Sequence, residues 1–355
     1  MTNRVPVMRP RLPAANSVLP YLRRMDASGE YANAGPLVRE LEHRYASFLG
    51  VPDDCVVATS SATLGLVGAV SVANMKRWMV PDFTFPAPGL AVLAAGAELV
   101  LVDVSPLDWV ADFTSGESSL DTGLLPVMPF GQNIDVNRWS RDVDVVVDGA
   151  GSLGASVGGL TDLPSRWSVV FSLHATKVLP AGEGGLVVFG DAGRADELRR
   201  WANFGFCQTR VSEVRGLNAK MPESGAAYAL ASLDAWPEEA DEWSAAQLTV
   251  SDAVSGIAGL SPMPGLPNVT SFHVVRFDSA ALCNEAVRCL DEDGVDSRRW
   301  WDSLHAMPAF AECARGRVNV AEELASTTLG LPMFRGLHRT QAERIAHALR
   351  RALAS

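Results

Sequence analysis

The chain has 355 residues, of which 48% are apolar and 20% charged, an ordinary balance for a globular protein with one large domain and a smaller one. A formal net charge of −11 argues against nucleic acid or an anionic membrane as a general partner, and no apolar run reaches the roughly 18 residues of a membrane-spanning helix. The five cysteines are scattered without a CxxC pair, which argues against a disulfide framework or a zinc site and favours reduced thiols in the cytoplasm.

The first part of the chain is predicted to be an arm followed by a helix. Residues 1–30 contain prolines and arginines and are expected to wrap another part of the molecule. Because residues 1–21 lack a continuous apolar core, we expect no signal peptide. After a turn cluster at 31–36, apolar residues recur at helical spacing over 37–49, and Gly50 indicates the end of that helix.

A small-residue turn at 60–63 separates a predicted strand at 55–59 from an apolar helix at 64–75. The free backbone amides of such a helix start, together with the positive end of the helix dipole, suit a phosphate group. Capping of the helix by Ser or Thr explains the same residues without any ligand. The residues alone leave both interpretations open.

Strands alternate with helices over the next part of the chain, which indicates a largely parallel α/β sheet. The predicted elements are a strand at 78–80, a helix at 89–95, strands at 97–104 and 124–129, and a strand from 143 that ends at Asp148.

The segment that follows Asp148 fits two interpretations. Gly149, Gly151 and Gly154 match GxGxxG, the fingerprint of a dinucleotide site, and so favour a nicotinamide-dependent oxidoreductase. That fingerprint must open a helix, whereas residues 155–160 are a poor helix start, and Asp148 would place a negative charge beside the pyrophosphate. In the second interpretation, Asp148 pairs with a protonated ring nitrogen and keeps a cofactor ring electron-withdrawing.

A lysine lies between two predicted buried strands near the middle of the chain. Apolar runs at 169–171 and 186–189 flank Lys177 and a loop rich in glycine. Burial disfavours the charged form of an amine and makes it a better nucleophile. The chain has only three lysines, Lys76, Lys177 and Lys220, against 27 arginines, and arginine cannot lose its proton to form an imine. A solvated loop lysine is the simpler alternative, but this setting favours a functional amine.

The remainder of the chain predicts a second, smaller α/β unit. Before it, the large domain is predicted to continue with helices at 192–201 and 223–233, and a helix from about 243 leads to a turn-rich break at 262–265. The smaller unit is predicted to contain a strand at 271–277, a helix at 280–292 and a closing helix at 340–354. We therefore predict an N-terminal arm over 1–30, a large domain over 31–245 and a small domain over 246–355.

One segment resembles a known family in detail. The residues are Phe171-Ser172-Leu173-His174-Ala175-Thr176-Lys177, followed by Gly182-Glu183-Gly184-Gly185. They look like the lysine segment of the DegT/DnrJ/EryC1/StrS family, pyridoxal-phosphate-dependent aminotransferases that act on nucleotide-linked keto-sugars. The resemblance implies the fold type I, aspartate aminotransferase-like architecture, with a large, mostly parallel seven-stranded-type sheet sandwiched by helices and a small C-terminal α/β domain.

The same resemblance implies the cofactor site. Lys177 would carry pyridoxal 5′-phosphate and shuttle protons, and Asp148 would hold the ring nitrogen. The other implied cofactor ligands are Ala62, Thr63 and Ser172 for the phosphate, Phe85 against the ring face, and Asn218 reaching the phosphate of the neighbouring subunit. At the position where the family usually has Gln or His against the ring hydroxyl, this chain has Gly151. That contact is left to Ser152 or a water.

Four residues are implied at the substrate. Lys220 would lie near the nucleotide diphosphate, Arg298 or Arg299 could hold a carboxylate or phosphate bidentately, and His305 would lie near the sugar. Each also has a plain structural interpretation: a solvated charge, surface ion pairs and a structural histidine. The other histidines show no metal-ligand spacing, so no metal is expected.

The resemblance covers roughly residue 31 to the closing helix and predicts a transaminase. L-Glutamate would donate the amino group to a nucleoside-diphosphate sugar, with a dTDP-4-keto-6-deoxyhexose as the favoured acceptor. A homodimer with shared active sites is expected because Asn218 is useful only across an interface. The alternatives are a sugar dehydratase of the same family, against which Lys177 argues because such members replace this lysine with histidine, a non-catalytic member, and the oxidoreductase suggested at Gly149.

Overall fold

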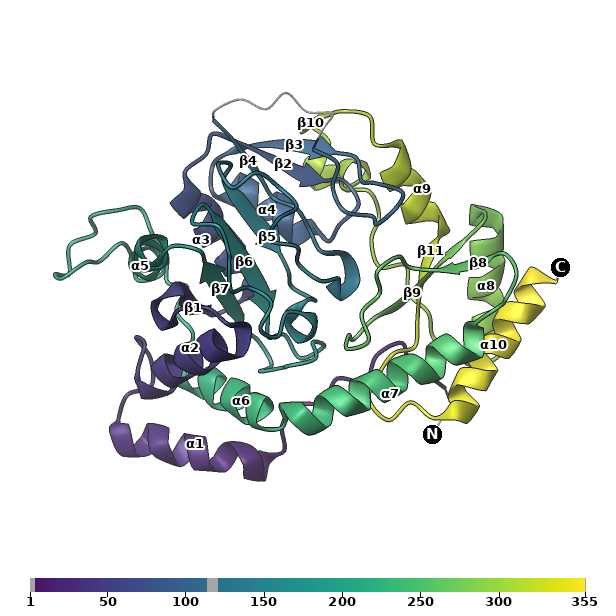
Figure 1. Cartoon of the computed structure of the whole chain (residues 1–355), viewed down its shortest axis with the longest axis horizontal. Coiled ribbons are helices and arrows are strands. Elements are labelled where there is room, and N and C mark those ends of the chain that lie inside the picture. Colours follow the sequence, from purple (N-terminus) through teal and green to yellow (C-terminus); the bar gives the residue numbers. More distant parts are fainter. Residues whose placement is uncertain (1–3, 114–120, 355) are drawn as a thin grey trace.

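The computed structural model describes residues 4–113 and 121–354. A large domain is built on one sheet with the strand order β1-β7-β6-β5-β4-β2-β3-β10 (Figure 1). Neighbouring strands run parallel except at β7, which is antiparallel to both β1 and β6. The strands are β1 (Val56–Thr59), β2 (Arg77–Pro81), β3 (Glu98–Val102), β4 (Thr122–Leu124), β5 (Val145–Asp148), β6 (Trp167–Ser172), β7 (Gly185–Phe189) and β10 (Ala314–Arg315). The predicted mostly parallel sheet is confirmed, and the two-residue β10 extends it by one strand.

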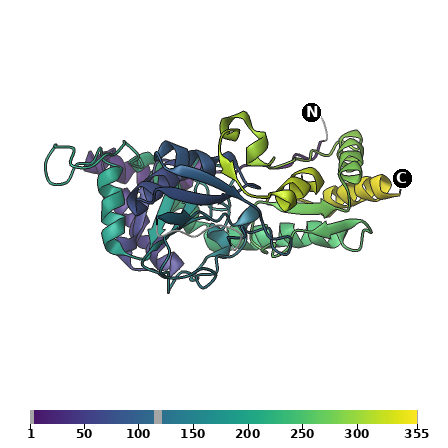
Figure 2. The same cartoon turned by 90° about the horizontal axis from the view of Figure 1, so that it is seen from above.

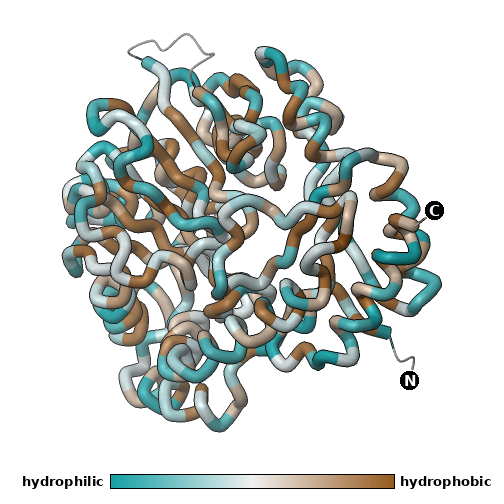
Figure 3. Tube along the Cα trace, turned by 45° about the vertical axis from the view of Figure 1, so that its right-hand side comes forward, coloured by the Kyte–Doolittle hydropathy of each residue, from teal (hydrophilic) through white to brown (hydrophobic). Residues whose placement is uncertain are grey.

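Helices cover both faces of this sheet. Alternate residues of one strand enter different cores: Val145 and Val147 of β5 pack into one hydrophobic cluster and Val146 into another. A strand buried on both faces needs apolar residues throughout, which is why these strands read as continuous apolar runs. The covering helices are α2 (Pro36–Leu49) and α6 (Glu223–Asp234) on one face, and α3 (Ala62–Ala73), α4 (Pro86–Ala94) and α5 (Ala192–Trp201) on the other. Figure 3 shows apolar residues along the interior strands.

The small domain contains an antiparallel sheet in the order β11-β9-β8. Its strands are β8 (Leu260–Pro262), β9 (His273–Phe277) and β11 (Thr328–Leu331), and its helices are α8 (Ala280–Glu292), α9 (Asn319–Thr327) and α10 (Arg339–Leu353). Figure 2 shows the two domains side by side along the long axis. The helix α7 (Trp236–Val254) connects them and runs unbroken through position 245, where the sequence analysis divides the domains.

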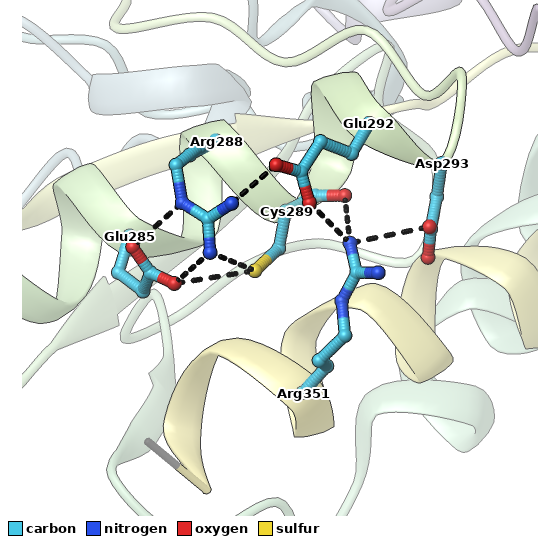
Figure 4. A network of polar contacts seen from close by, with 6 residues as sticks. All are labelled: Glu285, Arg288, Cys289, Glu292, Asp293 and Arg351. Carbon is cyan, nitrogen blue, oxygen red and sulfur yellow. Dashed lines mark hydrogen bonds and ion pairs between the residues drawn. The ribbon is translucent and has the colours of Figure 1, made fainter.

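Polar contacts on the surface join α8 to α10 (Figure 4). Arg351 of α10 donates to a carboxylate oxygen of Glu292 and to the backbone oxygen of Cys289. Arg288 bonds Glu285 and Glu292 on its own helix. Exposed ion pairs of this kind contribute about 0–1 kcal/mol each, so the apolar packing between the two helices carries most of their association.

The N-terminal arm contains a helix that the sequence analysis did not predict. Helix α1 (Ala15–Ser28) includes Pro20 and buries only Val18, so neither propensity nor periodicity signals it. Contacts with α6 hold it, including a hydrogen bond of 2.7 Å from the Tyr21 hydroxyl to Asp234. Before α1 the arm crosses to the small domain, where Val5 forms a parallel bridge with Val295. The arm therefore wraps another part of the molecule, as expected.

Two further stretches differ from the prediction. The strand predicted at 124–129 overlaps β4 only at Leu124, and the chain turns at η2 (Pro129–Gly131), where Phe130 has a φ of 52°. The short strands β8, β10 and β11 were not predicted, because strands of two to four residues carry too little periodicity. The nine-residue helix α9 was also not predicted. Among the described residues, no helix has both the length and the apolar character needed to cross a membrane.

Candidate active site

The loop that carries Lys177 connects the adjacent strands β6 and β7 and is pinned by backbone hydrogen bonds. Lys177 N–H donates to His174 at 2.9 Å, and Ala175 N–H donates to Gly182 at 2.9 Å. Gly182 has a φ of +91°, a left-handed conformation that glycine adopts without strain. The backbone position of Lys177 is thereby set by the loop itself.

Asp148 is the last residue of β5 and pairs in register with Val170 of β6. Parallel strands end at the same edge of a sheet, so Asp148 lies at the edge from which the Lys177 loop departs. Its Oδ1 accepts a hydrogen bond of 2.9 Å from the Ala150 N–H. Burial raises the pKa of Asp148 to about 6, and the nearby Lys177 amine partly offsets that rise. Burial in turn lowers the pKa of Lys177, against the effect of Asp148. The structure thus brings the two predicted catalytic groups into one site, in which Asp148 is buried and Lys177 is partly buried.

The predicted phosphate ligands also converge. Ala62 and Thr63 begin α3, and the Ser61 hydroxyl caps that helix by accepting from Leu64 N–H at 3.2 Å. Ser172 ends β6 directly opposite Gly185 of β7. A Cβ on Gly185 would lie 2.7 Å from the backbone nitrogen of Ala62, so only glycine lets the helix start approach the strands this closely.

The segment 218–220 lies against this helix start. The Ala219 backbone oxygen accepts a hydrogen bond of 2.8 Å from Ser60 N–H, and the backbones of Lys220 and Thr59 form an isolated antiparallel β-bridge. The Asn218 residue is exposed. The Lys220 amine donates to Asn203 Oδ1 at 2.8 Å and lies 4.8 Å from the centroid of the Phe204 ring. Burial lowers the pKa of Lys220.

Phe85 and Ser152 occupy opposite environments. Phe85 precedes the first turn of α4, and its side chain is 58% exposed. Ser152 is fully buried, and its hydroxyl has no hydrogen-bond partner within the described residues. Buried hydroxyls are rarely left unpaired, so Ser152 fits a group that can hydrogen-bond to it.

The tertiary structure decides between the two interpretations of the glycine segment. After Gly149 the chain forms only the three-residue turn η3 (Leu153–Ala155), so the helix required by a dinucleotide fingerprint is absent from this described segment. A side chain at Gly151 would be tightly packed, because a Cβ would lie 3.0 Å from Gly131 N and 3.3 Å from the Phe272 ring. The oxidoreductase interpretation is therefore wrong on its own structural criterion.

The two predicted substrate arginines lie in different settings. The Arg298 guanidinium lies 4.9 Å from the centroid of the Trp300 ring. Arg299 donates to Ser326 O at 2.8 Å and to Asn284 Oδ1 at 2.6 Å, and so ties the end of α9 to α8. The Arg299 guanidinium is therefore already hydrogen-bonded to groups of the small domain.

His305 is held by an aspartate that the sequence analysis missed. The fully buried Asp82 accepts from His305 N–H at 2.9 Å, and its other oxygen lies 2.7 Å from His305 Nδ1. The opposite ring nitrogen, Nε2, lies 3.2 Å from Glu322. No pattern in the sequence could have paired Asp82 with a residue so distant along the chain.

Phe272 is a second residue that the sequence analysis missed. It directly precedes β9 in the small domain, and the Lys177 amine lies 5.1 Å from the centroid of its ring. The predicted strand at 271–277 marks Phe272 as buried, but nothing in it points to a lysine of the other domain. Across the described residues, no cluster of His, Cys, Asp and Glu could hold a metal ion.

Comparisons with known proteins agree on one family. The model of the DegT/DnrJ/EryC1/StrS aminotransferase family matches residues 14–350. The chain is 30% identical to UDP-N-acetyl-3-dehydro-alpha-D-glucosamine 3-aminotransferase of Acidithiobacillus ferrooxidans, over 92% of this chain and 91% of that one. It is 25% identical to dTDP-4-amino-4,6-dideoxy-D-glucose transaminase of Shigella dysenteriae, over 97% and 98% of the two chains. Its fold is similar to that of DesI, solved with its TDP-sugar product, with a TM-score of 0.88 and 28% identity over 99% and 94% of the two chains.

Proposed function

The chain belongs to the DegT/DnrJ/EryC1/StrS aminotransferase family, and on that premise we propose that it moves the amino group of L-glutamate to a keto group of a nucleoside-diphosphate sugar. It is a pyridoxal-phosphate-dependent enzyme with the fold type I architecture. Two of the similar proteins carry dTDP- or TDP-linked sugars in their names, which supports a dTDP-4-keto-6-deoxyhexose as the acceptor. The observation that carries the proposal is the convergence of Lys177, from the β6–β7 loop, and Asp148, at the end of β5, in one site where each affects the pKa of the other.

The residues present fit the cofactor. The start of α3 leaves backbone N–H groups without intrahelical acceptors, and Gly185 removes the Cβ that would crowd them. We propose that Ala62, Thr63 and Ser172 hold the phosphate there. The unpaired hydroxyl of Ser152 is available to the ring, on the same loop as Asp148.

The two buried groups divide the chemistry. When bound, pyridoxal phosphate supplies a ring that stabilises negative charge at the amino-bearing carbon. We propose that the carboxylate of Asp148 holds a proton on the ring nitrogen, because a cation beside a buried carboxyl favours its ionised form. The Lys177 amine, with its pKa lowered by burial, accepts a proton from one carbon and returns it to another. The exposed ring of Phe85 is proposed to cover the face of the cofactor.

A homodimer with shared sites is part of the proposal. The segment between α5 and α6 projects from the large domain (Figure 1) and exposes the apolar side chains of Phe204, Val211, Val214 and Leu217. Exposed apolar side chains gathered on one segment are typical of an interaction surface. Asn218 ends this segment, and we propose that it reaches the cofactor phosphate of the partner.

The substrate is proposed to contact four residues. Lys220 lies beside the phosphate end of the site, where a diphosphate needs a cation. Arg298, Arg299 and His305 are the further candidates, and Arg299 must first release the carbonyl oxygens that it holds. The dehydratase and the non-catalytic member remain the competing outcomes of the test below.

The test follows a labelled amino group. The purified protein is loaded with pyridoxal phosphate, given ¹⁵N-glutamate, and offered dTDP-, UDP- and GDP-linked keto-sugars. We expect 2-oxoglutarate and a ¹⁵N-labelled amino sugar, most rapidly from the dTDP-4-keto-6-deoxyhexose. Lys177→Ala should abolish the label, whereas Lys76→Ala should not, because Lys76 is exposed and its amine forms an ion pair with Asp121. A sugar that loses water without gaining ¹⁵N would identify a dehydratase, and a bound cofactor that ignores every donor and sugar would identify a non-catalytic member.

A further inference from the structure

The small domain contributes one side chain to the surroundings of the Lys177 amine. Phe272 is 8% exposed, and its ring face lies 5.1 Å from Lys177 Nζ, within the range of about 6 Å at which a cation is attracted to an aromatic ring. Within the described part of the chain, that nitrogen donates no hydrogen bond to a protein acceptor. The ring face is therefore a protein group placed to stabilise the protonated form of the amine.

Other aromatic rings hold Phe272 in place. Its ring makes edge contacts with Phe130 at 5.6 Å and with Trp300 at 5.2 Å, measured between centroids. Phe130 in turn stacks on Trp301 at 4.1 Å and 14°. Phe130 comes from the large domain and the two tryptophans from the segment before η4 (Leu304–Ala306), so the ring is fixed from two sides.

Gly151 completes this arrangement on the loop that follows Asp148. A Cβ at that position would lie 3.3 Å from the Phe272 ring and 3.0 Å from Gly131 N. Any side chain there would push against a ring that its neighbours already hold. Because Gly151 has no side chain, the Phe272 ring can pack closely against the Asp148 loop.

Some groups near the Lys177 amine favour its protonated form and others disfavour it. Asp148 favours the ammonium form, and burial disfavours it. Three arginines, Arg9, Arg11 and Arg335, line a small cavity together with Lys177. Arg11 and Arg335 pair with carboxylates of α7, and the Arg9 guanidinium lies over the Phe334 ring at 4.5 Å. Since like charges disfavour a second cation, only Asp148 and the Phe272 ring support the ammonium among the described groups.

We propose that Phe272 is a positioning residue for Lys177: its ring face holds the protonated amine whenever the lysine is not bound to the cofactor. The inference rests on the proposed role of Lys177 as the cofactor lysine and proton carrier. It makes the docked small domain part of the site, because the ring reaches the amine only when the segment before β9 lies against the Asp148 loop.

The test measures the amine directly. Lysine labelled with ¹³C and ¹⁵N gives only three side-chain signals in this chain, and Lys76→Arg and Lys220→Arg assign them. The pKa of Lys177 is read by NMR titration in the protein loaded with pyridoxamine 5′-phosphate, in which the amine is free, and in the unloaded protein. Phe272→Leu should lower that pKa by about 0.5–1 unit, the size expected for loss of one cation–π contact. Phe272→Tyr should restore it.

Phe277→Leu is the matched control, because Phe277 is a buried ring on β9 with no contact to Lys177 among the described residues. It should leave the Lys177 pKa unchanged. If Phe272→Leu does not fold, Phe272→Met replaces it with a similar volume. An unchanged or raised pKa in a folded Phe272 variant, or an equal shift in the control, would overturn the inference. These results are independent of which donor or sugar the enzyme accepts.

Discussion

Replacing Glu223 by alanine should lower the free energy of unfolding by about 2–6 kcal/mol. Glu223 begins α6 and is fully buried, and its two carboxylate oxygens accept from Leu37 N–H at 2.7 Å and from Val38 N–H at 3.1 Å. These are the first N–H groups of α2, which have no acceptor within their own helix. Removing the carboxylate leaves two buried donors unpaired, at about 1–3 kcal/mol each.

Gly35 provides a second, coupled substitution. A Cβ on Gly35 would lie 2.8 Å from Glu223 Cδ, so Gly35→Ala forces the carboxylate away from the α2 donors. The single substitution should cost about 1–3 kcal/mol. In the Glu223→Ala background the new methyl group has space, and its cost should nearly vanish. The double variant should therefore be more stable than the sum of the single effects predicts, by about 1–3 kcal/mol.

Urea unfolding followed by circular dichroism measures the free energy of unfolding of the wild type, the two single variants and the double variant. Glu238→Ala is the control, because Glu238 also lies in the first turn of a helix but is exposed. It should change stability by less than about 0.5 kcal/mol. Effects of Gly35→Ala and Glu223→Ala that add to within about 0.5 kcal/mol would refute the proposed contact.

Three further changes test other contacts. In the cofactor-free protein, burial holds the pKa of Asp148 at about 6 against 3.8 in the unfolded chain, so the free energy of unfolding from this group falls as pH rises through that window. Between pH 4 and pH 7 this group should lower the free energy of unfolding of the wild-type protein by up to about 3 kcal/mol. Asp148→Asn should lack this loss of stability, which is measured by comparing urea midpoints at the two pH values. Asp82→Asn should cost about 1–3 kcal/mol through the His305 contacts. Ser61→Ala should cost about 1 kcal/mol by removing the cap on α3, and an unchanged urea midpoint would contradict that role.

Sequence patterns alone were sufficient for the architecture of the large domain. The strands β1, β2 and β3 alternate with helices α3 and α4 along the chain, and strands such as β5 and β6 are continuous apolar runs; the two features together are enough to predict a buried, largely parallel sheet. The setting of Lys177 between two such strands predicted a partly desolvated amine, and in the structure burial lowers the pKa of Lys177. These features depend on neighbours in the chain, so periodicity and composition carry them.

The tertiary structure decided what depends on distant segments. The glycines after Asp148 matched a dinucleotide fingerprint, and only the turn at η3 excluded it. Helix α1 forms against α6 in spite of Pro20. Phe272 reaches the Lys177 amine from another domain. Each outcome was set by packing between residues far apart in the sequence, where the energy of burial and hydrogen bonding outweighs local preference.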